Sequence, residues 1–153
     1  MAHSSGAFLC DACVLSQNEN TSPHFGGGAV TAVGPSANPV FNNSVFSHNI
    51  GLGPGGAIYV ADSAEPVFVN TQFLYNVDLL TAWGGGAAWI QSDAVFMDCD
   101  FVGNTCAGGG GAIWMVRRVP RPLPCCGWAS HSLRRWRTSG QGSKGGVLTV
   151  QVH

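Results

Sequence analysis

The hydrophobic positions along this chain recur in blocks, and neither a helical period nor simple alternation describes them. Three blocks, VFNNSVFSHN (40–49), VFVNTQFLYN (67–76) and VFMDCDFVGN (95–104), place two Phe residues and an Asn at matching positions, with steps of 27 and 28 residues between copies. A weaker copy, LCDACVLSQN (9–18), has Leu15 in place of the second Phe. A fixed period of this length indicates a repeat fold in which each copy is one supersecondary unit.

Each block leads through a Gly-rich segment to a Gly-Gly-Ala and a short apolar run, such as AIYV, AAWI or AIWM. The two Phe positions of a block are five residues apart, so strict strand alternation would send them to opposite faces. We expect the turn-forming residues between them to bend the backbone, so that both are buried. We therefore expect each unit to form three short strands joined by three corners. The Gly-Gly-Ala sequences show that four units precede residue 117, because they start at Gly27, Gly55, Gly85 and Gly110.

These units predict an all-β fold, a parallel β-helix of about four coils over residues 8–116, because Gly interrupts nearly every apolar run that could form a helix.

The charged residues divide the chain into two parts. All eight acidic residues precede residue 101, and all seven basic residues follow residue 116. Residues 117–153 are therefore interpreted as an irregular basic C-terminal segment, either a variable loop, an insert or non-native sequence, with a strand-like end at 145–152.

The pairing of Phe-x-x-Asn (FSHN, FLYN and FVGN) with Gly-Gly-Ala and a following residue (GGAV, GGAI, GGAA and GGAI) resembles the repeat of the polymorphic outer membrane proteins. The resemblance covers about residues 8–116 and departs from the pattern at Leu15. Those proteins belong to the pectin lyase-like group of right-handed β-helices, which includes pectate lyases. The resemblance implies a right-handed β-helix in an extracellular, cell-surface or outer-membrane protein that serves adhesion or display, rather than a particular enzyme.

The Asn that closes each block recurs in every unit, at Asn18, Asn49, Asn76 and Asn104. This recurrence predicts a stacked ladder in which each side-chain amide bonds the next and satisfies backbone groups at the corner. Two other Asn residues, Asn20 and Asn42, fit the pattern of N-glycosylation sites.

Three aromatic residues are the candidate binding residues. If Ile58 and Val60 and their counterparts point inward, Tyr59, Trp89 and Trp114 point outward on one face of the coils and stack there. We expect an exposed aromatic ladder of this kind to bind a carbohydrate or a protein partner. The alternative is that a long loop or the C-terminal segment covers these rings.

Catalysis is the second class of function, as a fragment of a polysaccharide lyase or glycoside hydrolase. A lyase needs a base to abstract a proton, and residues 1–116 contain neither Lys nor Arg. A hydrolase needs two carboxylates flanking one bond, for which Asp98 with Asp100, or Asp62 with Asp93, are the available pairs. These pairs could equally be solvated corner acids, and we expect a non-catalytic protein with no catalytic residues.

The six Cys and five His residues show no spacing that builds a metal site, so no metal or other cofactor is expected. Cys10-x-x-Cys13 is half of a zinc or redox motif, and Cys99 could pair with Cys106 in an oxidising compartment. The expected partner is a surface glycan or a protein, not nucleic acid. No apolar run is long enough to cross a membrane, and the absence of a readable signal peptide leads us to expect that the true beginning of a secreted protein is missing.

Overall fold

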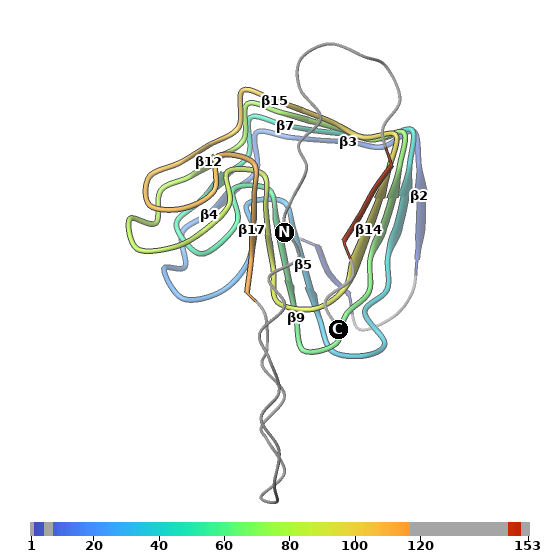
Figure 1. Ribbon diagram of the computed structural model, residues 1–153, viewed down its shortest axis with the longest axis horizontal. Coiled ribbons are helices and arrows are strands. Elements are labelled where there is room, and N and C mark those ends of the chain that lie inside the picture. Colours follow the sequence, from blue (N-terminus) through green and yellow to red (C-terminus); the bar gives the residue numbers. More distant parts are fainter. Residues whose placement is uncertain (1, 5–7, 117–146, 151–153) are drawn as a thin grey trace, which may run out of the picture.

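The computed structural model describes residues 2–4, 8–116 and 147–150, with side chains described over 8–116. All regular elements of these residues are strands, which wind as a parallel β-solenoid of about four coils (Figure 1). The predicted all-β fold of stacked coils is therefore confirmed. Of the basic C-terminal segment, residues 117–146 and 151–153 lie outside the described residues.

Four sheets run along the solenoid, and successive strands of one coil pass through them in turn. The sheet that carries the Gly-Gly-Ala strands, sheet A, contains β1 (Ala2–Ser4), β5 (Val30–Val33), β9 (Ile58–Ala61), β13 (Ala88–Ile90) and β17 (Ile113–Met115). Sheet B contains β2 (Leu9–Asp11), β6 (Val40–Asn42), β10 (Val67–Val69), β14 (Ala94–Met97) and β18 (Val147–Val150).

Sheets C and D complete each coil. Sheet C contains β3 (Val14–Ser16), β7 (Val45–Ser47), β11 (Gln72–Leu74) and β15 (Asp100–Val102). Sheet D contains β4 (Glu19–Asn20), β8 (Ile50–Gly51), β12 (Val77–Asp78) and β16 (Thr105–Cys106). The expectation of three strands per coil was wrong, because the residues just after the Asn column pair with neighbouring coils as the two-residue strands of sheet D before the Gly-rich loop begins.

β18 does not continue the coil pattern. Its sequence, Val-Leu-Thr-Val after a Gly-Gly pair, resembles the strands of sheet A, which pair in parallel. β18 instead pairs antiparallel with β14, with Phe96 opposite Leu148, and so lies along the last edge of sheet B. An added strand at this position pairs the open backbone edge of β14, which would otherwise be free to pair with another chain.

Two columns of stacked Phe rings run through the core, which buried Ala, Val and Ile side chains complete. The first column is Phe41, Phe68 and Phe96, and the second is Phe46, Phe73 and Phe101; neighbours within a column are nearly parallel, with centroids 4.7 to 5.4 Å apart. Rings of the two columns meet edge to face, as Phe41 and Phe46 do at 5.0 Å. Each such aromatic pair contributes about 0.5–1.5 kcal/mol beyond the burial of its area.

Left-handed corner residues let both Phe columns face inward. Between sheets B and C the φ angle is positive at Asn43 (49°), Asn70 (47°) and Asp98 (51°), and between sheets C and D it is positive at His48 (54°) and Tyr75 (53°). Asn and Asp tolerate this conformation better than most residues do. The predicted bend between the two Phe positions of each block is therefore confirmed.

The Asn ladder is confirmed in detail. The side-chain Oδ1 of Asn76 accepts both the backbone N–H and the side-chain Nδ2–H of Asn49, at 3.1 and 2.9 Å. The same pair of bonds joins Asn18 to Asn49 and Asn76 to Asn104. The second Nδ2 proton of Asn76 goes to the carbonyl of Phe46 at 3.0 Å. Every polar atom of this fully buried amide therefore has partners.

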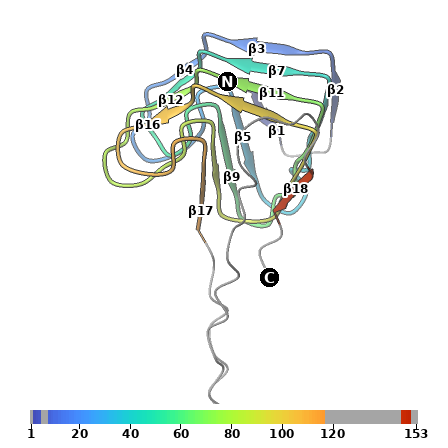
Figure 2. The ribbon, with the colours of Figure 1, turned by 45° about the horizontal axis from the view of Figure 1, so that its top comes forward.

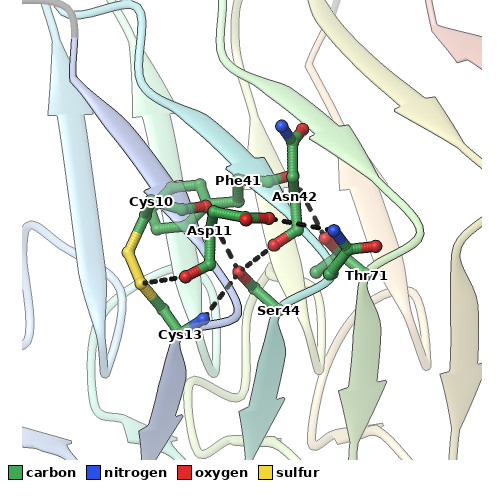
Figure 3. The surroundings of a disulfide bond; sticks show 8 residues. Cys10, Asp11, Cys13, Phe41, Asn42, Ser44 and Thr71 are labelled. Carbon is green, nitrogen blue, oxygen red and sulfur yellow. Dashed lines mark hydrogen bonds between the residues drawn. A yellow bond between two sulfur atoms is a disulfide. The ribbon is translucent and has the colours of Figure 1, made fainter.

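The first coil replaces part of the repeat with a disulfide. Cys10 takes the position of the first Phe, opposite Phe41, and is bonded to Cys13 (Figure 3). Cys13 lies just before β3, at the position that Ser44 occupies just before β7. The backbone N–H of Cys13 donates to Ser44 Oγ at 3.2 Å. The Cys pair is thus a structural bond of the outermost described coil, not half of a metal site.

Cys99 and Cys106 are free thiols, so the suggested pairing between them was wrong. Cys99 takes the place of Ser44 and Thr71 in a column of small donors, and its Sγ donates to the carbonyl of Met97 at 3.3 Å. Burial raises the pKa of the Cys99 thiol. The two half-buried thiols lie on different parts of the coil, since Cys99 precedes β15 and Cys106 belongs to β16.

Candidate binding site on the outer face of sheet A

The three candidate aromatic residues share one register position of sheet A. Trp89 lies opposite Tyr59 on one side and Trp114 on the other. Their neighbours Ile58, Val60 and Ile90 belong to the main core, whereas the aromatic rings form a separate cluster on the other face of the sheet. Tyr59 and Trp89 are stacked, with centroids 4.8 Å apart and planes 4° apart. The predicted alternation along these strands is confirmed.

The expected exposure of this ladder was wrong for two of its three members. Tyr59 is 6% exposed, Trp89 is 3% exposed and Trp114 is half-buried. Two loop residues cover the rings: Phe25 meets Tyr59 edge to face at 6.5 Å, and Trp83 meets Trp89 in the same way at 6.0 Å. Stacking within the ladder also occupies ring faces, which a sugar would need. The covering loop is thus the alternative that the sequence left open.

Phe25 and Trp83 come from loops between sheets D and A, which project on one side of the solenoid (Figure 2). The loops at 21–26 and 79–84, which follow β4 and β12, are longer than the loops at 52–54 and 107–109, which follow β8 and β16. Although both rings touch the ladder, Phe25 remains 68% exposed and Trp83 46% exposed. The accessible aromatic surface is therefore on the loops and not on the strands.

A buried amide holds the first of these loops. Asn20, the last residue of β4, is 2% exposed, and its Nδ2 donates to the carbonyls of Phe25 and Gly26 at 2.8 and 3.0 Å. Its Oδ1 accepts the backbone N–H of Ser22 at 3.0 Å, which closes a local turn. The folded protein therefore offers no accessible amide at Asn20 for glycosylation, contrary to the sequence pattern.

A buried carboxylate holds the third loop at the equivalent position. Asp78, the last residue of β12, is fully buried, and its Oδ1 accepts the backbone N–H of Leu80 at 2.8 Å. Its Oδ2 accepts the backbone N–H of Gly55, on the preceding coil, at 3.2 Å, and the thiol of Cys106, on the following coil, at 3.7 Å. A Cβ at Gly84 would collide with this carboxylate, so the loop returns close to it.

Burial raises the pKa of Asp78 above its ordinary value of 3.8, while the hydrogen bonds from Leu80, Gly55 and Cys106 act in the opposite direction. A perturbed carboxyl is a candidate acid in many active sites. Here the group has no exposed surface and is committed to backbone N–H groups. The geometry assigns Asp78 to loop structure and not to proton transfer.

The ladder contains one unsatisfied donor. Among the described side chains, Nε1 of Trp89 is the buried nitrogen or oxygen atom without a hydrogen-bond partner. Burying a donor in this way costs free energy, because its bond to water is not replaced.

Within the described residues, no group of three or more His, Cys, Asp or Glu side chains lies close enough to hold a metal ion. The same part of the chain contains no helix long and apolar enough to span a bilayer. The paired acids Asp98 and Asp100 are both exposed, on either side of the half-buried Cys99.

Sequence analysis missed the four residues that build the loops: Asn20, Phe25, Asp78 and Trp83. A signal for the two rings was present, because FGGGA (25–29) and WGGGA (83–87) share an aromatic residue followed by three Gly and Ala, whereas the other two loops lack it. No comparable signal marked Asn20 and Asp78, since their partners are mostly backbone groups brought together by the fold.

Two segments of the chain match a known repeat family. Residues 43–61 and 98–115 match the family described as the Chlamydia polymorphic membrane protein repeat. Each segment starts at a left-handed corner residue, Asn43 or Asp98, and ends at the last residue of a strand of sheet A, β9 or β17. No curated protein and no solved structure matches the chain. Two segments of the chain are therefore similar to the Chlamydia polymorphic membrane protein repeat, and they occupy corresponding parts of two coils of the parallel β-solenoid, separated by a coil without a match.

Proposed function

We propose that this chain is a structural and adhesive module of an extracellular, cell-surface or outer-membrane protein, and that it is not catalytic. The observation that carries this proposal is that the repeated residues build the solenoid itself. The Phe columns fill the core, and the Asn column closes the corners with hydrogen bonds. Residues outside the repeat, such as Phe25 and Trp83, are then free to differ from coil to coil on the surface.

The family match supports the proposed location, because the matched repeat is described as one of a membrane protein. A solenoid suits display, since it holds loops of different sequence at fixed intervals along a rigid body. Two observations favour a non-catalytic role. Residues 8–116 contain no Lys or Arg to act as a base, and the carboxylate with a raised pKa, Asp78, is inaccessible.

Adhesion is tested with beads coated with the full chain and applied to cultured epithelial cells. We expect more attachment than for beads coated with the same chain after denaturation, because the exposed loops keep their arrangement only in the folded solenoid. Equal attachment of the two preparations would contradict an adhesive role of the fold.

Catalysis is tested separately by incubating the full chain with polygalacturonate and with neutral polysaccharides. We expect no increase in reducing ends or in unsaturated uronate over a blank without protein. Release of either product, lost on replacing Asp98 and Asp100 by Asn, would establish the carbohydrate-active alternative instead.

A further inference from the structure

We propose that the loops between sheets D and A insert Phe25, Leu79 and Trp83 into the surface of a lipid bilayer, so that the folded chain binds zwitterionic phosphatidylcholine membranes. These three side chains are among the most exposed apolar groups of the described residues, at 68%, 48% and 46%. This inference rests on the proposed adhesive function and names the class of surface to which the module adheres.

Phe25 and Trp83 lie over the same part of the solenoid although they are far apart in the sequence. Each rests edge to face on a rung of the sheet A ladder, Phe25 on Tyr59 and Trp83 on Trp89. Those two rungs are neighbours, stacked with ring centroids 4.8 Å apart. The ladder supports both rings from below, so little conformational entropy is lost when a second phase covers them.

Leucine side chains extend this apolar surface at the base of the loops. The backbone N–H of Leu79 bonds the carbonyl of Gly51, so Leu79 lies beside Leu52 of the preceding coil. Leu79 is exposed and Leu52 is half-buried. An apolar patch that several coils build together indicates a site of interaction with a protein or a membrane.

The shape and composition of the patch favour a membrane. The loops project outward from one side of the solenoid (Figure 1, Figure 2). A protein partner would need a pocket shaped to receive each projecting anchor, whereas fluid lipid chains adapt to any shape. Trp, Phe and Leu are also the residues that interfacial elements bury at the boundary between head groups and acyl chains.

The distribution of charge favours the same orientation. The loops at 21–26, 52–54, 79–84 and 107–109 contain no Asp, Glu, Lys or Arg, and their one ionisable side chain is His24, next to Phe25. Asp78 is buried, and Glu19 lies on β4, before the first loop begins. Insertion of the loop tips therefore leaves the other acids in water, because these lie between sheets A and B or beside the corner between sheets B and C: Asp62, Glu65, Asp93, Asp11, Asp98 and Asp100.

The seven basic residues, which all follow residue 116, offer a competing mode of membrane binding. Attraction between these residues and anionic lipids would be electrostatic and would weaken as salt is added. Insertion of apolar side chains needs no anionic lipid and is not weakened by salt. Lipid charge and salt concentration therefore separate the two modes.

The expected affinity is modest. An aromatic side chain has about 150–250 Å² of surface, so the exposed fractions of Phe25 and Trp83 correspond to roughly 100 Å² each. Together with Leu79, this area compares with that of a single myristoyl chain, which binds membranes reversibly with a constant of about 10⁴ M⁻¹. Lipid at about 1 mM should therefore bind most of the chain.

The test is flotation of the full chain with phosphatidylcholine vesicles at about 1 mM lipid. We expect binding that persists when NaCl is raised from about 0.15 M to about 1 M, which shortens the screening length from about 8 Å to about 3 Å. Phe25→Ala and Trp83→Ala should each lower the partition coefficient about tenfold, and Leu79→Ala somewhat less. Binding that requires phosphatidylglycerol and is lost at high salt would overturn the proposal, because the basic residues would then carry it.

Quenching of tryptophan emission by brominated phosphatidylcholine identifies the inserted residue. The chain has five Trp residues, of which Trp128 and Trp136 lie outside the described residues. Trp83→Phe keeps an apolar ring on the loop, so this variant should still bind vesicles but lose most of the quenching. Undiminished quenching would place another Trp in the bilayer and contradict insertion of the loop.

Leu9→Ala and Tyr75→Ala are the matched controls. Leu9 is 66% exposed on sheet B, and Tyr75 is 52% exposed and stacks on His48 at the corner between sheets C and D. Both variants should bind like the original chain, and circular dichroism should show that all variants keep the same β spectrum. If Phe25→Ala or Trp83→Ala unfolds the chain, Leu79→Ala still decides the question, since Leu79 is not part of the ladder cluster.

Failure of this proposal is distinguishable from failure of the general function. If beads coated with the chain adhere to cells but no phosphatidylcholine vesicle binds, adhesion stands and the membrane proposal fails. If Phe25→Ala or Trp83→Ala then reduces attachment to cells, the loops bind a protein or glycan of the cell surface, and the membrane proposal is again overturned.

Discussion

Replacement of Asn76 by Ala removes the centre of the Asn ladder, and its cost can be worked out from the contacts. Asn76 Oδ1 accepts the backbone N–H and one Nδ2–H of Asn49, at 3.1 and 2.9 Å, in a fully buried environment. Ala leaves both donors of Asn49 without an acceptor. Each orphaned buried donor costs about 1–3 kcal/mol, so we expect a loss of about 4 kcal/mol in the free energy of unfolding.

The same substitution at the first position of the column provides the control. Asn18 donates one side-chain bond to Asn49, at 2.9 Å, and the backbone N–H of Asn18 still bonds Asn49 when that side chain is gone. Asn18→Ala should therefore cost only about 1 kcal/mol, the value of an ordinary hydrogen bond. Asn104→Ala should fall between the two, because Asn104 is the acceptor for two donors of Asn76 but is itself half-buried.

Urea unfolding of the full chain, followed by far-UV circular dichroism, measures these differences. A domain of this size has a free energy of unfolding of about 5–15 kcal/mol, so Asn76→Ala could be close to unfolding at room temperature. In that case the test is the comparison of Asn104→Ala with Asn18→Ala. Equal losses for Asn18→Ala and Asn104→Ala would refute the argument, since they would show that the stability does not depend on which donors lose an acceptor.

Three other predictions concern the loops and the first coil. Gly84→Ala should displace the loop of Trp83, because its Cβ would collide with the Asp78 carboxylate, and should shift the tryptophan emission to longer wavelength; unchanged emission would contradict the close approach. Folding raises the pKa of Asp78, so the folded state binds more protons than the unfolded state, and the free energy of unfolding should fall as pH rises above about 3.8. Urea unfolding between acid and neutral pH should show a smaller fall for Asp78→Asn than for the original chain. An equal dependence of stability on pH in the two proteins would disprove this assignment. Replacing Cys10 and Cys13 together by Ser should cost about 2 kcal/mol in urea unfolding, the entropy of closing so short a loop, and this variant, unlike the original chain, should be insensitive to a reductant.

Much of the solenoid was predictable from the sequence because its coils are stacked copies of one another. Residues one period apart lie side by side, so Phe41, Phe68 and Phe96 form a ring stack and Asn49 and Asn76 form an amide ladder. The alternation along each strand likewise placed Ile58 in the core and Tyr59 outside it. These features depend only on period and parity, which a sequence displays directly.

What the sequence alone could not determine lies where the coils differ. The exposure of Tyr59 and Trp89 was decided by Phe25 and Trp83, which reach the ladder from loops of unequal length. Those loops in turn depend on buried groups that bond backbone atoms. Asp78 is the clearest case, since it accepts an N–H from Gly55 on the preceding coil and a thiol proton from Cys106 on the following one. A backbone N–H is present at nearly every residue, so only the tertiary structure decides which one meets a given carboxylate.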